Sequence, residues 1–571
     1  MAFPCRRQLS HTNTLFLFRS TSLNALWLPP VAAIVFLLLY NTAFWRRLIA
    51  ATGEPGASAT LLCVVLLIVA GVFTGFLALL NVRLFIKPFL ALLCIGSAFA
   101  SYFMDNYGIQ IDRAMIRNLA ETDVAEATEL LHWKLWAWIV AAGVLPALLV
   151  MRLPLHQLPW PRHLAWSIGL ALGAFALAAV LLLMFFKTLA PLVRENRDLR
   201  FLLAPTNYLH ATKGYLQQRF ARPAVLRPLG RDARKGADWQ GQERPAVLVI
   251  VVGETARAQN FSLNGHQRET NPRLARQPGL VNFRSVTSCG TATAVSLPCM
   301  FSNLGRQDYA DAQARSQESL LDVLSHAGID VLWRNNNSGC KGVCDRVDYE
   351  DLSRPEPGAS YCNDDECFDE RLLERLPERL RSGKDMVVVL HQKGSHGPAY
   401  WKRTPAAFRK FGPVCATSEL AQCSGAAIAA AYDNTILYTD HVVSRAIDML
   451  RDSSARDGVD TALIYVSDHG ESLGEDGLYL HGAPYLLAPP EQRRVPMMMW
   501  FSDGFSERFR FSRSCVAARA DQPLSHDNLF HSVLGMLDVK TMAYNPRLDL
   551  FHACTTTAGA PTGRVQASGL R

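Results

Sequence analysis

The stretch Ala246-Val-Leu-Val-Ile-Val-Val-Gly253 is an unbroken apolar run, rich in β-branched residues. Runs of this kind are typical of strands buried on both faces of a parallel sheet. Two similar runs, Asp385-Met-Val-Val-Val-Leu390 and Thr461-Ala-Leu-Ile-Tyr-Val466, follow, and a helical stretch at 427–452 lies between them. Strands that alternate with helices predict an α/β domain with a mainly parallel sheet over residues 245–554.

Polar residues stand just beyond two of these runs. Glu254 follows the first run directly, and Asp468 and His469 follow the third. Ligand sites in open α/β sheets gather outside the carboxyl ends of the strands, and carboxylates with an imidazole suit zinc. Such residues can also simply cap the following helices. Because several of them occur at successive strand ends, we favour a divalent metal site.

The segment Ser288-Cys-Gly-Thr-Ala-Thr-Ala-Val-Ser-Leu-Pro-Cys299 predicts a turn that leads into a helix N-terminus. Backbone N–H groups and the helix dipole at such a position favour a phosphate group. A hydroxyl coordinated to zinc there loses its proton more readily and can attack phosphorus. Thr291 and Thr293 are both candidates on these grounds, and an ordinary threonine N-cap is the alternative.

Four further polar residues lie in loops on the expected ligand side of the sheet. His396 and His481 occur in loops that contain glycine or proline, and we leave a structural and a functional role equally open for each. Lys341 and Asn337 share the segment 335–341. Lys341 either holds a phosphate as a point charge or is simply solvated.

The first third of the chain predicts a transmembrane domain over residues 1–188. A bilayer span needs about twenty apolar residues, and the stretches long enough are 26–44, 59–80, 84–103, 135–151 and 164–186. With five spans the two ends of the chain lie on opposite sides. Seven Lys and Arg lie at the N-terminus and in the loops on its side of the membrane, and five lie in the loops on the other side. Because cytoplasmic loops carry an excess of Lys and Arg, this favours a cytoplasmic N-terminus.

The formal net charge of +8 comes mostly from one segment. Residues 187–244 hold twelve Lys and Arg against five Asp and Glu. A basic segment directly after the last apolar run favours anionic lipid head groups as its partner, and no nucleic-acid-binding motif occurs elsewhere. We therefore expect a basic interfacial linker at 189–244 and no nucleic acid partner. The tail at 555–571 is expected to be disordered.

The thirteen cysteines divide between the two parts of the chain. Three lie in the apolar third, and ten lie after residue 280. Those ten fall mostly into close pairs, which are Cys289 and Cys299, Cys340 and Cys344, Cys362 and Cys367, and Cys415 and Cys423, with Cys515 and Cys554 left as a further pair. Close pairs favour disulfides in an oxidising compartment such as the periplasm. A structural zinc site is the weaker alternative, because no paired C-x2-C pattern occurs.

The polar loop at 105–132 contains Asn118, Thr122 and Glu126, which are spaced four apart. On a helix these three side chains would share one face. The spacing alone favours an ordinary solvated face.

Six motifs, in this order along the chain, resemble those of the lipid A phosphoethanolamine transferases, which belong to the alkaline phosphatase and sulfatase superfamily. They are Val252-Gly-Glu-Thr-Ala-Arg257, Asn260-Phe-Ser-Leu-Asn-Gly265, Ser288-Cys-Gly-Thr-Ala-Thr293, His396-Gly-Pro-Ala-Tyr400, Ser467-Asp-His-Gly-Glu-Ser472 and Tyr479-Leu-His-Gly482. The resemblance extends over nearly the whole chain, the five spans included.

The resemblance implies a role for each candidate residue. It makes Thr293, rather than Thr291, the nucleophile. The implied zinc ligands are Glu254, Thr293, Asp468 and His469. Asn337 and Lys341 are implied to contact the substrate. The residues implied to bind a head group are Asn118, Thr122 and Glu126. The residues implied to bind the transferred group or a second metal ion are His396 and His481. The close cysteine pairs match the family's disulfides, although the pair Cys340 and Cys344 is found in only part of it.

The reaction that the resemblance implies has two steps. Phosphatidylethanolamine in the outer leaflet of the bacterial inner membrane donates phosphoethanolamine to Thr293 and releases diacylglycerol, and lipid A then accepts the group at a phosphate. The protein would be a monomer with a periplasmic catalytic domain. Its product would lower the negative charge of the outer surface and so weaken the action of cationic peptides such as polymyxins. The alternatives are a relative that uses a phosphoglycerol donor or a core-sugar acceptor, and a non-enzymatic envelope scaffold or sensor.

Overall fold

The computed structural model describes residues 23–52, 58–121, 128–156, 158–196, 198–220, 225–355, 361–363 and 366–555. The chain divides into two compact units that do not follow the order of the sequence. The helical unit comprises Met1–Phe99 and Ala137–Arg197, and the α/β unit comprises Ala100–Trp136 and Asp198–Arg571. The polar loop that joins two membrane helices is therefore part of the α/β unit.

A seven-stranded sheet forms the centre of the α/β unit, in the order β5-β13-β10-β4-β9-β7-β8. In chain order the strands are β4 (Ala246–Gly253), β5 (Val281–Phe283), β7 (Asp330–Asn335), β8 (Asp348–Asp351), β9 (Met386–His391), β10 (Asp460–Ser467) and β13 (Met497–Phe501). The run from β10 to β8 is parallel, and β13 pairs antiparallel with both of its neighbours. The predicted mainly parallel sheet is confirmed.

The three central strands coincide with the three apolar runs of the sequence. Every residue of β4, β9 and β10 is buried. Strands covered on both faces need apolar side chains on both faces, so their sequences show continuous runs rather than alternation.

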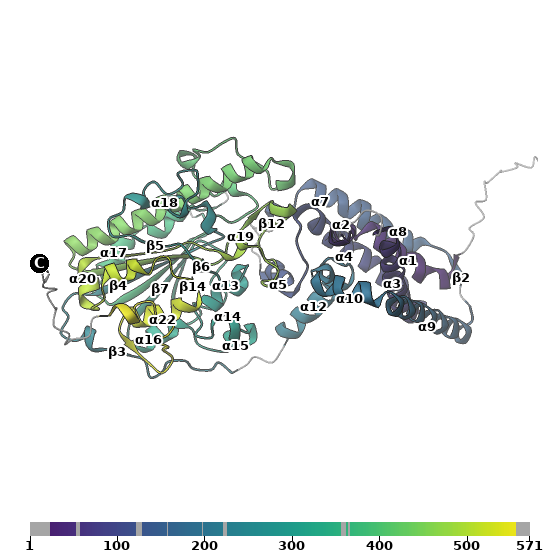
Figure 1. Cartoon of the computed structure of the whole chain (residues 1–571), viewed down its shortest axis with the longest axis horizontal. Helices are drawn as coiled ribbons and strands as arrows, with labels where there is room; N and C mark the ends of the chain where they lie inside the picture. Colours follow the sequence, from purple (N-terminus) through teal and green to yellow (C-terminus); the bar gives the residue numbers. More distant parts are fainter. Residues whose placement is uncertain are drawn as a thin grey trace, which may run out of the picture. The chain divides into compact units, whose positions relative to one another are not determined.

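Helices cover both faces of this sheet. Helix α18 (Gly425–Arg456) runs along one side, and α16 (Leu320–His326) and α22 (Asp527–Met536) lie on the other (Figure 1). Ser424 caps the N-terminus of α18, because its side chain accepts a hydrogen bond from the Ala427 N–H. The helix contains the predicted helical stretch 427–452. With helices on both sides, access to the sheet is left at the strand ends, where the polar residues lie.

The helical unit contains the apolar helices. They are α1 (Leu28–Leu39), α2 (Thr42–Thr52), α3 (Ser58–Leu79), α4 (Ile86–Tyr107, whose end belongs to the α/β unit), α7 (Trp133–Trp138, whose start up to Trp136 belongs to the α/β unit), a π-helical segment (Ile139–Val144), α8 (Leu145–Arg152), α9 (Trp160–Met184) and α10 (Phe186–Glu195). In the part of the chain that the structure describes, four segments are long and apolar enough to cross a membrane, and a fifth is added if α1 and α2 together make one span.

The first predicted span, 26–44, is not one straight helix. Helices α1 and α2 meet at an angle of 70°. Asn41 Nδ2 donates to the Phe36 carbonyl and Trp45 Nε1 donates to the Leu37 carbonyl, both at 2.8 Å. These side chains satisfy carbonyl groups at the end of α1, so the break leaves fewer unpaired backbone groups in an apolar environment.

Helices also occupy the start of the predicted linker. After α10, the helices α11 (Leu199–Leu202) and α12 (Thr206–Arg219) belong to the α/β unit. Further on, the Arg227 N–H donates to the Ser316 carbonyl, so the chain runs against the α/β unit there. At the C-terminus, Thr555 bridges Phe511, and the rest of the predicted tail lies outside the described residues.

All five expected disulfides are present in the α/β unit. They join Cys289 to Cys299, Cys340 to Cys344, Cys362 to Cys367, Cys415 to Cys423 and Cys515 to Cys554. Among the described residues, Cys63 and Cys94 are free thiols, and both lie in the helical unit.

Candidate active site

Glu254, Asp468 and His469 lie together because β4 and β10 are adjacent and parallel. Gly253, the last residue of β4, pairs with Ser467, the last residue of β10. The residues that follow each strand therefore emerge side by side at one edge of the sheet. All three side chains are fully buried, and one ligand atom from each lies within 4.8 Å of the others.

Thr293 places its hydroxyl group in this cluster. It is the first residue of α13 (Thr293–Met300). Its Oγ1 lies 3.0 Å from Glu254 Oε1 and 3.3 Å from His469 Nε2. The Thr291 hydroxyl instead donates to the Ala483 carbonyl at 2.6 Å. Thr293, and not Thr291, therefore faces the buried carboxylate.

The turn before α13 requires a glycine. A Cβ on Gly290 would come within 2.8 Å of the backbone nitrogen of Ser296. Because a contact that short is not tolerated against backbone, Gly290 lets the turn close tightly onto the helix and so places Thr293 at its first position.

The charges of this cluster suit a bound cation. Burial raises the carboxyl pKa of Glu254, but the hydrogen bond and positive charge of His469 outweigh it and hold the pKa well below its ordinary value. Burial and the negative charge of Glu254 raise the pKa of Asp468 to about 7. Burial lowers the pKa of His469, but Asp468 and Glu254 raise it to about 10. Two buried carboxylates repel each other, and a cation between them removes that repulsion.

The donor atoms fit zinc. Two carboxylates, one imidazole and the Thr293 hydroxyl offer four oxygen and nitrogen donors, as a tetrahedral zinc site requires. Asp468 Oδ2 is buried and accepts no hydrogen bond within the described part of the chain. An unsatisfied buried carboxylate oxygen is costly, and metal coordination is one way to satisfy it. These residues would hold the ion.

Asn337 orients Glu254 from the other side. Its Nδ2 donates to Glu254 Oε2 at 2.6 Å and to the Gln392 carbonyl at 3.0 Å. His391, the last residue of β9, lies 3.4 Å from the same nitrogen and bonds Asn335 through Nδ1. Burial lowers the pKa of His391 to about 4, so this ring is neutral at pH 7. Asn337, expected to contact substrate, thus directly contacts a candidate metal ligand.

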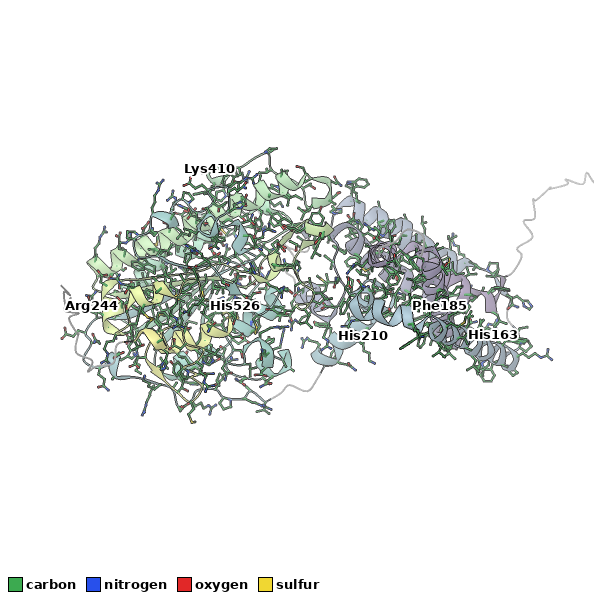
Figure 2. The ribbon with its side chains drawn as sticks, in the orientation of Figure 1. His163, Phe185, His210, Arg244, Lys410 and His526 are labelled. Atoms are coloured by element: carbon green, nitrogen blue, oxygen red, sulfur yellow. A yellow bond between two sulfur atoms is a disulfide. The ribbon has the colours of Figure 1, made fainter. Side chains whose placement is uncertain are left out.

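Sequence reasoning missed two residues that hold the strand end in place. The Ser296 hydroxyl donates to the Asp468 carbonyl. His526, labelled in Figure 2, is buried and bonds the Ser467 carbonyl through Nε2, and its Nδ1 accepts the Cys289 N–H. Burial lowers its pKa to about 4, so the ring is neutral. His526 follows no apolar run, so no sequence pattern pointed to it.

The two histidines left open by the sequence lie near the metal candidates. The His481 ring lies 4.5 Å from the ring of His469 and 5.5 Å from that of His396. His481 Nδ1 lies 3.4 Å from a carboxylate oxygen of Glu471, which is fully buried. Glu471 is a further acid that the sequence reasoning did not assign.

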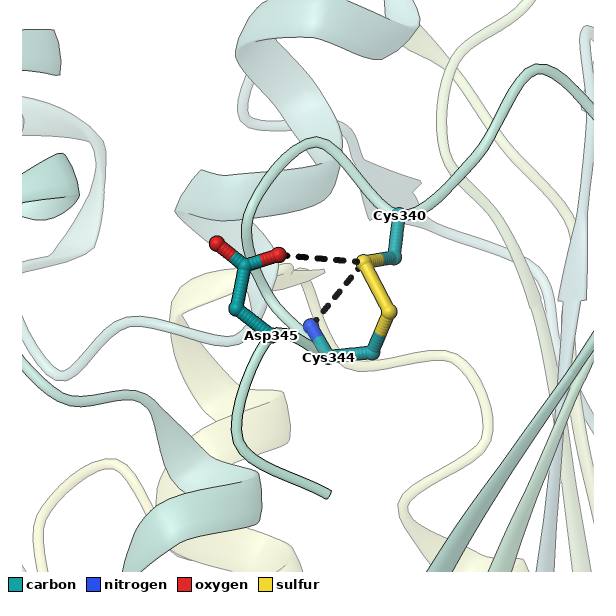
Figure 3. A group of neighbouring side chains, drawn as sticks. All are labelled: Cys340, Cys344 and Asp345. Carbon is teal, nitrogen blue, oxygen red and sulfur yellow. Dashed lines mark hydrogen bonds between the residues drawn. A yellow bond between two sulfur atoms is a disulfide. The ribbon is translucent and has the colours of Figure 1, made fainter. Parts of the chain in front are cut away.

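Lys341 lies in a loop closed by a disulfide. Its Nζ donates to the Ser338 carbonyl at 3.1 Å and to the Glu121 carbonyl at 3.3 Å, and it lines a cavity of about 550 Å³. The neighbouring Cys340 and Cys344 form the disulfide drawn in Figure 3, and Asp345 lies beside it. The cysteine sulfurs are bonded to each other, so these three residues do not form a thiolate metal site.

Part of the polar loop lies against this site. Asn118 belongs to α5 (Arg113–Glu121), and its Nδ2 would lie 3.4 Å from a Cβ on Gly482, the residue after His481. Asn118 therefore lies near the loop that carries His481. Thr122 and Glu126 lie outside the described residues.

Two protein families match the chain. The family described as phosphoethanolamine transferase EptA/EptB matches residues 67–220, and the sulfatase family matches residues 246–539. Phosphoethanolamine transferase EptA of Escherichia coli strain K12 is 39% identical over 550 residues, which cover 94% of this chain and 98% of that protein. Phosphatidylethanolamine transferase Mcr-1 of Escherichia coli is 38% identical over 466 residues, which cover 80% and 84%.

The solved structures give the same result. The integral membrane protein lipooligosaccharide phosphoethanolamine transferase A from Neisseria meningitidis superposes with a TM-score of 0.88 at 35% identity, over 94% of this chain and 100% of that one. The soluble domain of the same protein superposes with a TM-score of 0.55 at 43% identity, over 58% and 99%. The similarity thus includes both units.

Proposed function

The chain belongs to the EptA-type phosphoethanolamine transferases, and from this premise we propose that it transfers phosphoethanolamine from phosphatidylethanolamine to a phosphate of lipid A. The observation that carries the proposal is the position of the Thr293 hydroxyl. It lies at a helix N-terminus, 3.0 Å from Glu254 Oε1 and 3.3 Å from His469 Nε2. A buried hydroxyl held by an acid and an imidazole suits a covalent nucleophile.

The proposed reaction has two steps. In the first, Thr293 Oγ1 attacks the donor phosphorus, the bond from phosphorus to the glycerol oxygen breaks, and diacylglycerol leaves with the proton that Thr293 has lost. In the second, an oxygen of the acceptor phosphate attacks the same phosphorus and the bond from phosphorus to Thr293 Oγ1 breaks. Thr293 Oγ1 then takes up the proton that the acceptor phosphate has lost, which restores the threonine hydroxyl. Glu254 accepts the hydrogen bond of the Thr293 hydroxyl and so orients the nucleophile.

The remaining site residues bind and orient the substrates. Zinc held by Glu254, Thr293, Asp468 and His469 would lower the pKa of the threonine hydroxyl and neutralise charge on the phosphoryl oxygens. His396 and His481 hold the transferred group or a second zinc ion. Asn118 and Lys341 contact the donor head group. We assign the same role to Thr122 and Glu126.

The cellular setting is part of the same proposal. The protein acts as a monomer in the bacterial inner membrane, with its N-terminus in the cytoplasm and the α/β unit in the periplasm. Five disulfides in the α/β unit support this placement, because disulfides persist in oxidising compartments. The added amine lowers the negative charge of the outer surface and so weakens the binding of cationic peptides such as polymyxins.

Mass spectrometry of lipid A tests this function in cells with and without the protein. We expect added phosphoethanolamine only when the protein is present. A modified core sugar or an added phosphoglycerol group would contradict the acceptor or the donor. Thr293→Ala should lower transfer by about 10³-fold or more, as loss of a nucleophile does. Thr291→Ala is the matched control and should retain transfer, whereas activity that survives Thr293→Ala and is lost in Thr291→Ala would make Thr291 the nucleophile.

A further inference from the structure

A second cavity of the α/β unit has no role in the mechanism above. It has a volume of about 680 Å³, a size that is ordinary for ligand sites, and is lined by residues of α5, α11 and α12 and by Ile111 and Asp112, which directly precede α5. The Ile111 N–H donates to the Phe201 carbonyl and ties the start of α5 to α11. We call this cavity the α5–α12 pocket.

Positive charge dominates the lining of the α5–α12 pocket. Arg113, Arg117, Arg200 and His210 line it, and Asp112 is the acid among the lining residues; Figure 2 labels His210 on α12. Asp112 Oδ1 accepts the Met115 N–H and so serves the first turn of α5. The basic side chains therefore outnumber the acid, and cations gathered around one cavity repel each other unless an anion binds.

Two of these arginines are exposed and carry no ion pair within the described part of the chain. They are Arg113 and Arg200, and neither guanidinium group forms an ion pair with a described carboxylate. Arg200 lies 4.5 Å over the ring of Phe201. Arg113 lies against α12 at Gly214, where a Cβ would come within 2.9 Å of its Nε. Local packing thus positions both guanidinium groups.

Arg117 connects the pocket to the nucleophile. It lines the pocket, is 3% exposed, and donates from Nη2 to the Ala294 carbonyl at 2.8 Å. Ala294 directly follows Thr293 in α13. An anion in the pocket is therefore held beside the first turn of the helix that starts with Thr293.

We propose that the α5–α12 pocket binds a phosphate group of the acceptor lipid, an inference that rests on the proposed transfer to lipid A. Guanidinium groups bind phosphate through paired, charge-assisted hydrogen bonds. A phosphomonoester carries about two negative charges at neutral pH, which suits several arginines. The donor head group carries one negative phosphate and a positive amine, so it suits this lining less well. Anionic phospholipid and free phosphate share the phosphate chemistry, and the test separates them.

The test uses the full chain in nanodiscs of phosphatidylcholine and phosphatidylethanolamine. Arg113→Gln/Arg200→Gln should raise the KM for lipid A about tenfold or more, as loss of charge-assisted contacts predicts. Release of diacylglycerol without acceptor should stay within about twofold of the wild-type value, because the donor step does not use the pocket. Arg113→Lys/Arg200→Lys should restore part of the lipid A affinity.

A matched control removes the same charge elsewhere. Arg381→Gln/Arg456→Gln changes two arginines whose side chains are 59% and 77% exposed, and it should leave both half-reactions unchanged. Binding can be measured without turnover by native mass spectrometry of the Thr293→Ala variant. The ligands added are lipid A, dephosphorylated lipid A, phosphatidylglycerol or inorganic phosphate. We expect Arg113→Gln/Arg200→Gln to weaken only the binding of phosphorylated lipid A.

Three results would overturn the proposal. Equal losses in both half-reactions would mean that the arginines support the fold. Loss of phosphatidylglycerol binding with an unchanged KM for lipid A would assign the pocket to anionic phospholipid. Loss of inorganic phosphate binding alone would leave a simple anion site. If wild-type protein releases no diacylglycerol, the proposed function fails, and the lipid A binding measurement still decides the pocket.

Discussion

Asn337 helps to fix the position of Glu254 through a direct hydrogen bond. It donates to Glu254 Oε2 at 2.6 Å, and its own position is set by the bond to the Gln392 carbonyl. Groups that orient metal ligands in this way commonly contribute 10- to 100-fold to metal affinity, an order-of-magnitude range. Residues beyond the strand ends thus complete the site that the strand ends begin.

Asn337→Ala should weaken zinc binding by about 10- to 100-fold and lower transfer, because Glu254 loses the donor that orients it. The measurements are zinc content after dialysis and the rate of diacylglycerol release at saturating zinc. Asn303→Ala is the control, since this amide bonds Gln317 away from the site. Normal zinc content in Asn337→Ala would show that the amide serves substrate binding alone.

At the scale of elements, the loop closed by Cys340 and Cys344 holds Lys341 in a conformation that is uncommon for a residue with a side chain. The φ angle of Lys341 is +52°, in the left-handed region that favours glycine. The two cysteines are only four residues apart in sequence, so their disulfide closes a short loop. This loop maintains the conformation of Lys341 and the position of its amine.

Cys340→Ser/Cys344→Ser should raise the KM for the donor severalfold and cost about 2 kcal/mol or less in stability, because the closed loop is short. Cys515→Ser/Cys554→Ser opens a loop with a sequence separation of 39 and should cost about 4 kcal/mol with an unchanged KM. The measurements are thermal unfolding in detergent and donor kinetics. A KM that changes equally in both variants would separate Lys341 from donor binding.

Helix α22 carries a pH-sensitive contribution to stability through His531. The ring is 3% exposed, and its Nδ1 accepts the Asn545 N–H at 3.1 Å. Burial lowers its pKa from 6.5 to about 4. Between about pH 6.5 and pH 4 the histidine is protonated in the unfolded chain but neutral in the folded one. Its contribution to the free energy of unfolding is therefore fully present above about pH 6.5 and is lost as the pH falls toward 4.

His531→Gln should remove this dependence, because a carbonyl oxygen can replace the ring nitrogen as acceptor and does not titrate. Between pH 7 and pH 5, wild-type protein should lose about 2 kcal/mol more stability than the variant. Thermal unfolding in detergent at the two pH values measures the difference. Parallel losses in the two proteins would show that other groups dominate the acid response.

At the scale of the whole molecule, the bent pair α1–α2 decides the topology. If the pair crosses the bilayer, five spans put the two ends of the chain on opposite sides, whereas four spans put them on the same side. The disulfides support a periplasmic C-terminal end in either case. The location of the N-terminus therefore tests whether the bent pair is a span.

A fluorescent protein that matures only in the cytoplasm, fused before Met1, should be fluorescent, and a phosphatase that is active only in the periplasm should be active when fused after Thr555. A phosphatase fused after Arg152 is the control and should be inactive, because one span separates that residue from the periplasmic end. A dark N-terminal fusion with an active C-terminal one would mean that α1 and α2 enter and leave the membrane on the same side.

Local sequence patterns were sufficient to establish the mainly parallel sheet, the apolar helices and three members of the site. Buried strands need continuous apolar runs, and parallel strands deliver Glu254, Asp468 and His469 to one edge. Close cysteine spacing likewise identified four of the disulfide pairs, because short loops restrict the possible partners, and it left Cys515 and Cys554 as the fifth pair. For Thr293 the local pattern left two threonines open, and the family resemblance chose between them.

Tertiary packing was needed to show which hydroxyl group faces the carboxylate, because that direction depends on how α13 packs against the sheet. Packing also brings His526 next to Cys289, 237 residues away in sequence, whose N–H it accepts. It makes α5 part of the α/β unit. It bent the first predicted span between α1 and α2, where the side chains of Asn41 and Trp45 donate to carbonyl groups at the end of α1. Each of these contacts joins residues that no periodic pattern relates, so it exists only once the chain has folded.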